Sequence, residues 1–230
     1  MCITGRFAPT GFFISKIFGL QTDIIHILDN IAYRSKDMSE TLLSVLEWIA
    51  VAFNLLFIVL LVKKNILCWI FGILGSLLSV FLFLSPEVKL YSEAILYGVY
   101  ALLGIYGWYM WRGRKESDFT IITWDIPFHV LSILIGLFIW IALGYVMTNY
   151  TSAQTPWADA FSTSFGFVAT YLEAKKVLQG WYYWIVLNLF SIFLYASKNL
   201  DILALMMVVY SVLSVIGLIR WRKDYKAQMN

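Results

Sequence analysis

The stretch Trp181-Tyr182-Tyr183-Trp184-Ile185-Val186-Leu187-Asn188 opens an apolar segment that continues to Ala196. Trp181, Trp184 and Asn188 stand at i, i+3 and i+7, so on a helix they share one face. At a rise of about 1.5 Å per residue, Asn188 lies roughly 10 Å further along the axis than Trp181. Indole rings stack on flat ligands, and an amide both donates and accepts hydrogen bonds. Taken singly, each of these residues could have a structural role. A tryptophan can lie at the membrane interface or pack in the interior, and an asparagine can bond to a neighbouring helix. Their shared face favours a ligand site.

The composition around this stretch is that of a helical membrane protein. The 230 residues are 61% hydrophobic and 13% charged, with a mean hydropathy of +0.77. A soluble domain is about half apolar and a quarter charged. The apolar residues form continuous blocks of membrane-spanning length, which indicates helices rather than the alternating strands of an outer-membrane barrel. The net charge is +3, and the lysines and arginines form no basic stripe suited to nucleic acid. Cys2 and Cys68 offer no metal-binding spacing, so we expect no cofactor.

Seven apolar blocks are predicted to cross the membrane. They lie at about 43–62, 66–84, 91–111, 126–148, 159–177, 181–196 and 202–220. Before them, residues 11–31 have apolar side chains at helical spacing, interrupted by Lys16, Asp23, His26 and Asp29. This pattern predicts an amphipathic helix on the membrane surface.

Lysine and arginine concentrate in the loops on one side of the predicted bundle. That side holds Lys63, Lys64, Arg112, Arg114, Lys115, Lys175, Lys176, Arg220, Arg222, Lys223 and Lys226, whereas the opposite short loops hold Lys89 and Lys198. The positive-inside rule then places the rich side and the C-terminus in the cytosol. Residue 40 is outside, and the extreme N-terminus is inside only if residues 11–31 also cross.

An internal repeat predicts the architecture. Val99-Tyr100, Gly107 and Trp111-Arg112 match Val209-Tyr210, Gly217 and Trp221-Arg222 at an offset of 110 (209 − 99). Residues 63–76 align with residues 178–191 at an offset of 115 (178 − 63), which puts Trp69 on Trp184. Two parallel three-helix repeats with a connector helix, a 3+1+3 arrangement, are typical of transporters that bind substrate between repeats. The predicted segments are an N-terminal region (1–40), a first repeat (41–111), loops with a connector helix (112–158), a second repeat (159–226) and a tail (227–230).

Polar side chains inside the apolar blocks extend the candidate site. A charge at the bilayer centre costs about 2.5–3.5 kcal/mol on insertion scales, so such groups need a partner or a function. Asn54, Thr170 and Tyr100 each lie on a polar face of their block. Those faces also carry Glu47 in the first block, Thr163, Gly166 and Glu173 in the fifth, and Glu93, Tyr97, Gly104 and Gly107 in the third. Glu93 and Glu173 lie near helix ends, where Glu173 can pair with Lys176.

The sequence contains no catalytic constellation. It has no HExxH motif, P-loop or GxSxG motif, so we expect neither an enzyme nor an ATP-driven pump. No buried acidic pair or histidine relay offers an ion-coupling site. The chain is better suited to passive binding and alternating access.

The motif Trp181-x-x-Trp184-x-x-x-Asn188 resembles that of the PnuC family of nicotinamide riboside transporters of bacterial inner membranes. Asp159-Ala-Phe-Ser-Thr, Glu47-Trp48-Ile-Ala-Val and Lys64-Asn65-Ile-Leu-Cys-Trp69 extend the resemblance, which covers about residues 40–226. It implies a fold similar to that of SWEET sugar transporters, uptake without an ion gradient, substrate trapping by cytoplasmic phosphorylation, and a homotrimer.

By the same resemblance, Trp181, Trp184 and Asn188 contact the substrate, with Trp69 as their pseudo-symmetric counterpart. The offset of 115 places Ile73 opposite Asn188 (188 − 115), so the two halves need not contact the substrate alike.

The predicted substrate agrees with the chemistry of the motif. Nicotinamide riboside carries a flat cationic ring, which aromatic faces attract. A phosphorylated analogue would bring a dianion to a site without arginine, which desolvation disfavours. Relatives in the family carry thiamine or riboflavin, so another vitamin is the alternative substrate. A membrane-embedded interaction subunit without a substrate path is the alternative of a different class.

Overall fold

The computed structural model describes residues 41–85, 91–113, 120–151, 155–199 and 201–229. The amphipathic helix predicted over residues 11–31 lies outside these ranges. Residues 47–230 form one compact unit, and the arrangement below is that of this unit.

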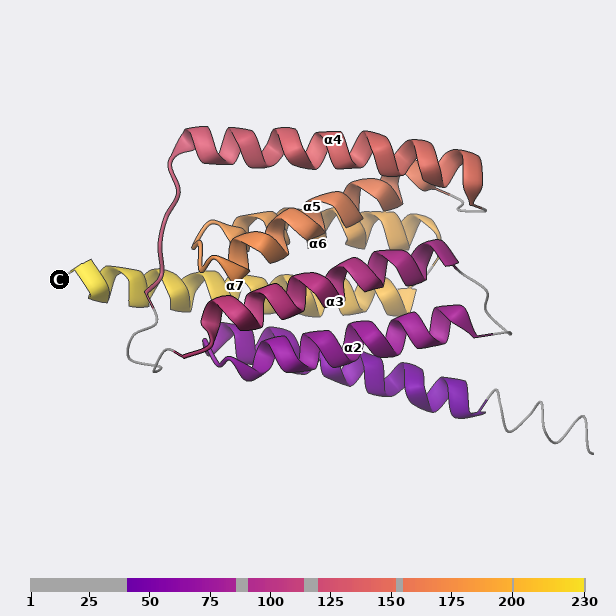
Figure 1. The fold of residues 1–230 in the computed structure, drawn as a ribbon, viewed down its shortest axis with the longest axis horizontal. Helices are drawn as coiled ribbons and strands as arrows, with labels where there is room; N and C mark the ends of the chain where they lie inside the picture. Colours follow the sequence, from indigo (N-terminus) through magenta and orange to yellow (C-terminus); the bar gives the residue numbers. More distant parts are fainter. Residues whose placement is uncertain (1–40, 86–90, 114–119, 152–154, 200, 230) are drawn as a thin grey trace, which may run out of the picture. The chain divides into compact units, whose positions relative to one another are not determined.

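The described residues form seven helices. An unlabelled first helix, Thr41–Val62, precedes α2 (Leu67–Leu84), α3 (Tyr91–Trp111), α4 (Ile126–Tyr150), α5 (Pro156–Ala174), α6 (Gly180–Ser197) and α7 (Asp201–Met229). The prediction of an all-helical membrane protein is confirmed, and the helices lie close to the predicted blocks (Figure 1). Three boundaries differ by three residues or more, and one of them is the end of α5, at Ala174 instead of the predicted 177. The early proline at Pro156 starts α5 three residues before the predicted block (159 − 156), and α7 continues beyond residue 220 through a basic segment of good helix formers.

Five of these helices are long and apolar enough to cross a membrane, and α5 and α6 are not among them. The two exceptions carry the polar motif residues, and α5 is enclosed by protein, with ten of its nineteen residues buried. A helix that packs against protein can be less apolar than one that faces lipid. The weaker hydropathy of α5 therefore agrees with its position inside the bundle, whereas α6 exposes Val186, Leu189 and Phe193.

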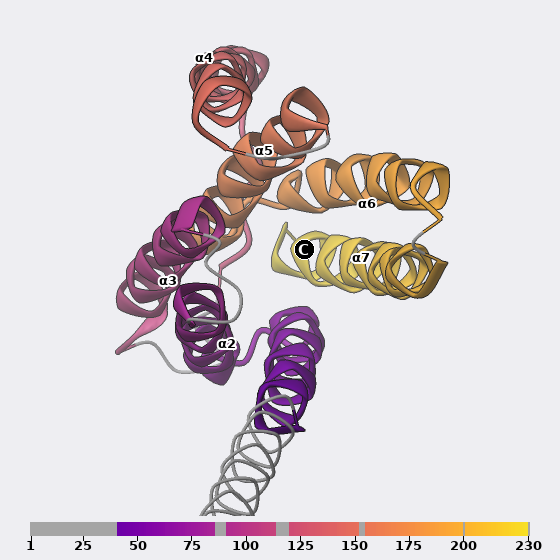
Figure 2. The same ribbon diagram turned by 90° about the vertical axis from the view of Figure 1, so that its right-hand side faces the viewer.

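Helices that are consecutive in sequence pack side by side. Residues 47–62 pack on α2, α2 packs on α3, and α5, α6 and α7 follow in the same manner, with α3 joined to α5. Figure 2 shows these helices around a common axis, while α4 lies outside and packs on α5. The buried residues of α4 are few, and two of them, Gly136 and Gly144, admit Phe165 and Trp157 from α5.

The two turns that join the first helix to α2 and α5 to α6 have matching backbones. Lys64 and Lys176 both adopt left-handed conformations, with φ of 60° and 63°. The Lys64 N–H bonds to the Leu61 carbonyl and the Lys176 N–H to the Glu173 carbonyl, each at 2.9 Å. The turns therefore match at an offset of 112 (176 − 64), and the offset of 115 predicted from sequence is wrong here. Both offsets pair Trp69 with a tryptophan, Trp184 at 115 and Trp181 at 112, and the backbone of the turn decides between them.

This correction changes the partners of the motif residues. At an offset of 112, Trp69 corresponds to Trp181 and Ser76 to Asn188, while Trp184 has Gly72 at its counterpart position. Trp69 would meet any side chain added at Gly107, and Trp181 would meet one added at Gly217. The shared environments of Trp69 and Trp181 agree with the shorter offset.

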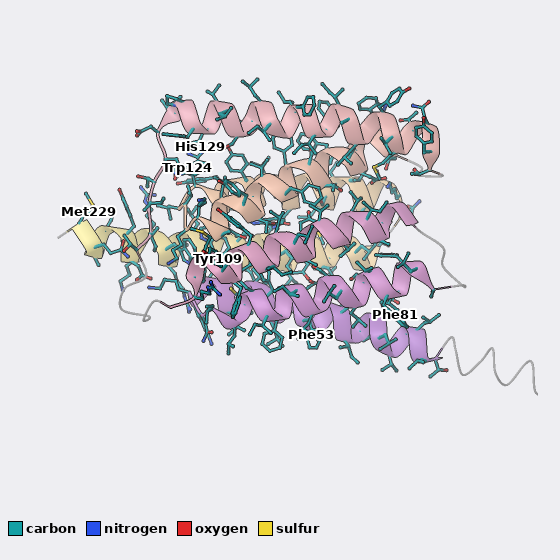
Figure 3. All side chains as sticks on the ribbon, in the orientation of Figure 1. Phe53, Phe81, Tyr109, Trp124, His129 and Met229 are labelled. Atoms are coloured by element: carbon teal, nitrogen blue, oxygen red, sulfur yellow. The ribbon has the colours of Figure 1, made fainter. Side chains whose placement is uncertain are left out.

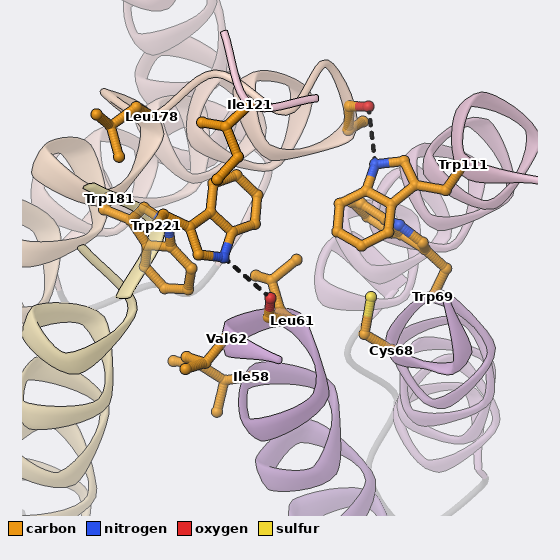
Figure 4. Close-up of a cluster of buried hydrophobic side chains, with 11 residues drawn as sticks. Ile58, Leu61, Val62, Cys68, Trp69, Trp111, Ile121, Leu178, Trp181 and Trp221 are labelled. Atoms are coloured by element: carbon orange, nitrogen blue, oxygen red, sulfur yellow. Dashed lines mark hydrogen bonds between the residues drawn. The ribbon is translucent and has the colours of Figure 1, made fainter. Parts of the chain in front are cut away.

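Four tryptophans close one end of the unit, and we call them the tryptophan cluster: Trp69, Trp111, Trp181 and Trp221 (Figure 4). Trp69 packs edge-on against Trp111 at 5.4 Å between ring centres, and Trp181 packs edge-on against Trp221 at 5.5 Å. The Trp111 indole N–H donates to the Ala174 carbonyl at 3.0 Å, and the Trp221 indole N–H donates to the Leu61 carbonyl at 3.3 Å. The Ala174 carbonyl lies at a helix end, where carbonyls lack intrahelical partners, whereas the Leu61 carbonyl also accepts the Lys64 N–H.

The tryptophan cluster lies at the basic end of the unit, which we define by the ends of α3, α5 and α7 and the start of α4. Tyr109, Trp124, His129 and Met229 mark this end in Figure 3. A salt bridge of 2.8 Å joins Lys64 to Asp224, and the Gln228 side chain accepts a hydrogen bond from the Ile121 backbone. These contacts fasten the extension of α7 to the first turn and to the segment before α4.

Candidate ligand site

Trp69 and Trp181 are packing residues in this structure. Both are fully buried in the tryptophan cluster, at 0% exposure. Their rings rest on Gly107 of α3 and Gly217 of α7. Full burial also excludes an interfacial position for Trp181, because such an anchor must reach the membrane surface. Their indole N–H groups nevertheless have no hydrogen-bond partner among the described residues.

Trp184 differs from Trp181 because its ring is only half-buried. It approaches Gly166 on α5, at 3.9 Å from the position of an added Cβ, and the Tyr100 hydroxyl from α3 occupies the same position more closely. Thr170, one turn further along α5, donates its hydroxyl to the Gly166 carbonyl at 2.8 Å. Gly166 therefore lets two predicted site residues, Trp184 and Tyr100, meet, and Thr170 lies one turn away on the same face of α5.

Asn188 lies on the same face of α6, one turn beyond Trp184. Its amide nitrogen donates to the Ser214 hydroxyl at 3.1 Å, and that hydroxyl donates to the Tyr210 carbonyl at 2.8 Å. This chain fixes the orientation of the Asn188 amide. The amide oxygen has no hydrogen-bond partner within the described ranges, so it remains an acceptor for a ligand.

Tyrosines line the continuation of this face toward the other end of the unit. Tyr97 and Tyr100 on α3 lie near Tyr195 on α6, and Tyr97 also lies near Tyr210 on α7. All four rings are half-buried although they lie inside the bundle. At the far end, Lys198 forms a salt bridge of 3.3 Å with Asp159, and Glu93 lies close to the same carboxylate. Aromatic and hydroxyl groups thus extend from Trp184 toward the end opposite the tryptophan cluster.

Asn54, the remaining predicted site residue, faces α2. Its side-chain oxygen lies 3.1 Å from the position of a Cβ added to Gly75. The structure thus places it at the contact between the first helix and α2, whereas Trp184 and Tyr100 meet at Gly166.

Glu173 is a fully buried carboxyl next to this site. It lies one turn beyond Thr170 on α5, its exposure is 0%, and the Trp184 indole lies beside it. That approach falls short of a hydrogen bond, since neither carboxyl oxygen has a partner among the described residues. The sequence predicted a pair between Glu173 and Lys176, but the Glu173 carboxyl and the Lys176 ammonium form no hydrogen bond with each other. The Lys176 ammonium instead lies 5.7 Å from the centre of the Trp111 ring.

A separate pocket of about 480 Å³ lies between α4, α5 and α6. Its walls are apolar, and α6 contributes Tyr182, Tyr183, Val186 and Leu187 to it. These positions lie on the side of α6 opposite Trp181, Trp184 and Asn188. The pocket is therefore distinct from the candidate site.

Sequence reasoning did not select Ser214, Gly166 or Glu173 as site residues. The signal for Ser214 is its spacing, because Tyr210, Ser214, Gly217 and Trp221 lie at i, i+4, i+7 and i+11 on α7. The sequence pattern placed Gly166 and Glu173 on the polar face of α5. Their roles beside Tyr100 and Trp184 depend on contacts with other helices, which the pattern does not show.

The chain matches the family described as "Nicotinamide mononucleotide transporter" over residues 44–223, which is more than three quarters of its length. This chain belongs to the nicotinamide mononucleotide transporter family. The chain is 28% identical over 192 residues to the nicotinamide riboside transporter PnuC of Neisseria mucosa, covering 77% of this chain and 72% of that protein. It is 23% identical over 206 residues to the Escherichia coli protein of the same name, covering 78% of this chain and 85% of that protein.

A solved structure supports the fold of this family member. The crystal structure of the vitamin B3 transporter PnuC matches 98% of this chain and 95% of its own, with a TM-score of 0.64 and 22% identity. This likeness shows the fold. Together with the apolar helices and the family, it establishes a multi-pass membrane transporter and confirms the resemblance to the PnuC family.

Proposed function

We propose that this protein carries nicotinamide riboside across the bacterial inner membrane. Curated relatives that share about a quarter of its residues are named nicotinamide riboside transporters. The observation that carries the proposal is the meeting of Trp184 and Tyr100 at Gly166, with Thr170 one turn away on α5 and the Asn188 amide one turn away on α6. The half-buried indole provides a face for the nicotinamide ring, and the free oxygen of Asn188 provides an acceptor for the carboxamide N–H or a ribose hydroxyl.

The riboside fits these side chains better than its phosphorylated form. Around Trp184 stand a tyrosine, a threonine and the buried carboxyl of Glu173, and none of the three is a cation. A phosphate dianion here would be desolvated beside a carboxyl, which is unfavourable. The description of the family names the mononucleotide, but the substrate that we propose is the unphosphorylated riboside.

The proposed architecture is seven crossings in a parallel 3+1+3 arrangement similar to that of SWEET transporters, with α4 as the connector. The matching turns at Lys64 and Lys176 and the matching contacts of Trp69 and Trp181 support it. Substrate then lies between the triplets, and alternating access exposes it to one side at a time. The tryptophan cluster is the closed end in this structure.

The proposed mechanism is facilitated diffusion by a homotrimer, followed by cytoplasmic phosphorylation that traps the substrate. The basic end faces the cytosol in this proposal, because it gathers most of the lysines and arginines among the described residues. A phosphorylated product would not re-enter a site without a cation. The pocket between α4 and α6 and the exposed apolar face of α4 leave surface for neighbouring protomers or lipid.

Uptake of radiolabelled nicotinamide riboside into proteoliposomes tests this function. We expect uptake to stop at equal internal and external concentrations and to be unaffected by sodium or proton gradients. Excess thiamine or riboflavin should compete poorly. Competition by either vitamin at the affinity of the riboside would favour the alternative substrate, and absence of uptake would favour an interaction subunit. Accumulation driven by a proton gradient without any kinase would contradict the uncoupled mechanism.

A further inference from the structure

We propose that the Glu173 carboxylate is the counter-charge for a cationic ring held on Trp184, so that the site selects aromatic cations over neutral analogues. This inference rests on the proposed function and names the residue that sets its charge specificity. No motif residue supplies such a charge, because the motif consists of two tryptophans and an asparagine.

The first observation is that Glu173 has no hydrogen-bond partner among the described residues. Among the Asp and Glu side chains that the structure describes, it is the one that is fully buried, and neither of its oxygens is bonded. Burying a carboxyl without a partner is costly, whether or not it is ionised. We therefore expect the partner of this carboxyl to come from outside the chain, as a bound ligand.

The second observation is the location of Glu173 on its helix. It lies in the last turn of α5, where the helix dipole is negative. An acid is stabilised at the start of a helix and destabilised at its end. Its own backbone carbonyl is already occupied, since it accepts the Lys176 N–H at 2.9 Å. Local helix structure therefore gives no reason for an acid at this position.

The third observation is that the carboxyl lies next to the aromatic platform. The Trp184 indole is its neighbour, and Thr170 and Gly166 lie one and two turns away on the same face of α5. Gly180, at the start of α6, brings the two helices together, with the Glu173 Cγ 3.5 Å from the position of an added Cβ. A cation stacked on Trp184 would lie within a few ångströms of the carboxylate, in a region shielded from water.

Two further groups at this end are unpartnered donors, the indole N–H groups of Trp69 and Trp181. Both belong to the buried cluster that includes Ala174, the residue after Glu173. Both rings are enclosed in the tryptophan cluster of this structure, so the charge preference rests on Glu173 alone.

The test compares two ligands that differ in ring charge. Nicotinamide riboside is cationic, and its dihydro form is neutral but keeps the carboxamide and the ribose. Binding of each to the purified full chain is measured by calorimetry for the parent protein, Glu173→Gln, Glu173→Asp and Glu47→Gln. Glu47 is an exposed acid on the first helix and serves as the matched control.

We expect Glu173→Gln to weaken binding of the cationic riboside by about ten- to a hundredfold, which corresponds to about 1.4–2.8 kcal/mol, and to change binding of the neutral form less than threefold. Glu173→Asp should keep the preference for the cation, and Glu47→Gln should behave as the parent. Glu173→Gln should also raise the melting temperature of the ligand-free protein, because it removes an unpaired buried acid. A role in packing alone would lower that temperature.

The proposal is overturned if Glu173→Gln binds the cation as tightly as the parent, or if it loses both ligands by the same factor. If Glu173→Gln fails to fold, the parent protein alone provides the test. Equal affinity of the parent for the cationic and the neutral ligand would exclude a counter-charge. A parent protein that binds neither ligand would overturn the proposed function itself.

Discussion

At the scale of single residues, the two tryptophans of the motif have different roles. Trp181 is completely enclosed against Gly217 and Trp221, whereas Trp184 keeps part of its ring accessible beside Tyr100 and Glu173. Equal spacing in a sequence says only that two side chains share a helix face. Whether a face is filled by a neighbouring helix or left open depends on residues far away in the chain, here on Gly217 and Gly166.

Truncation of Trp184 should therefore weaken binding without unfolding the protein. Stacking on an aromatic ring is worth about 1–3 kcal/mol by alanine substitution, so Trp184→Ala should lower affinity for nicotinamide riboside roughly ten- to a hundredfold. Trp184→Phe should retain more affinity, and Asn188→Leu should lose affinity because a polar group of the ligand would be left unpaired. Calorimetry on the purified protein measures these changes.

Trp48→Ala is the control for this comparison, since Trp48 is 71% exposed on the first helix. Trp181→Ala should show the opposite behaviour and lose about 3–5 kcal/mol of stability, the usual cost of emptying a buried tryptophan site. Unchanged affinity in both Trp184→Ala and Asn188→Leu would assign these residues to packing.

At the scale of helices, most of the fold could be predicted from sequence. Continuous apolar blocks bounded by basic or polar turns gave the positions of the first helix and of α2, α3, α4 and α6 closely, because the length of a crossing is set by the membrane. The register between the two triplets could not be predicted in full. It depends on left-handed turns at Lys64 and Lys176. The Lys-Lys pairs at 63–64 and 175–176 stand at the offset of 112, but a lysine pair does not by itself predict a left-handed backbone.

The candidate site was predicted in part for the same reason. Helix periodicity grouped Trp184 with Asn188, and Thr170 with Glu173, because each pair lies on one helix. It could not show that Tyr100 meets Trp184, or that Asn188 bonds to Ser214, since these contacts join different helices.

A glycine pair tests whether close packing holds the tryptophan cluster in place. A Cβ added at Gly217 would lie 2.5 Å from the Trp181 ring, whereas nothing lies within 4 Å of the corresponding position at Gly98. Gly217→Ala should destabilise the protein by about 1–3 kcal/mol through overpacking. Gly98→Ala should stabilise it by up to about 1 kcal/mol through helix propensity.

Thermal unfolding in detergent measures both glycine variants under the same conditions. If Gly217→Ala melts at or above the temperature of Gly98→Ala, the contact between Trp181 and α7 is looser than the structure shows.

The two crossed indole bonds give a second test at this scale. Trp221→Phe keeps an aromatic ring but removes the N–H that donates to the Leu61 carbonyl. We expect a loss of about 0.5–1.5 kcal/mol of stability, the net contribution of a typical hydrogen bond. Trp111→Phe should cost a similar amount through Ala174. In the double variant, a loss larger than the sum would show that the bonds act together.

At the scale of the whole molecule, orientation in the membrane is the property that most needs a test. Single cysteines at Met229 and Tyr150, in a chain whose Cys2 is replaced by serine, report the two ends, since both positions are highly exposed. Cys68 is buried and can remain. An impermeant maleimide should label Tyr150→Cys in intact cells and label Met229→Cys only after lysis. Labelling of Met229→Cys in intact cells would reverse the proposed orientation.

The crossed bonds of Trp111 and Trp221 also bear on how tightly the bilayer is sealed. Each bond ties the last helix of one triplet to the end of the first helix of the other, so the two triplets separate at that end only if both bonds break. In the proposed alternating access, opening at this end is then close to all-or-none, with little population of a gap wide enough for water but too narrow for substrate. A cell that stores energy as a proton gradient needs this property in every carrier, because a chain of water molecules through a half-open carrier would conduct protons continuously.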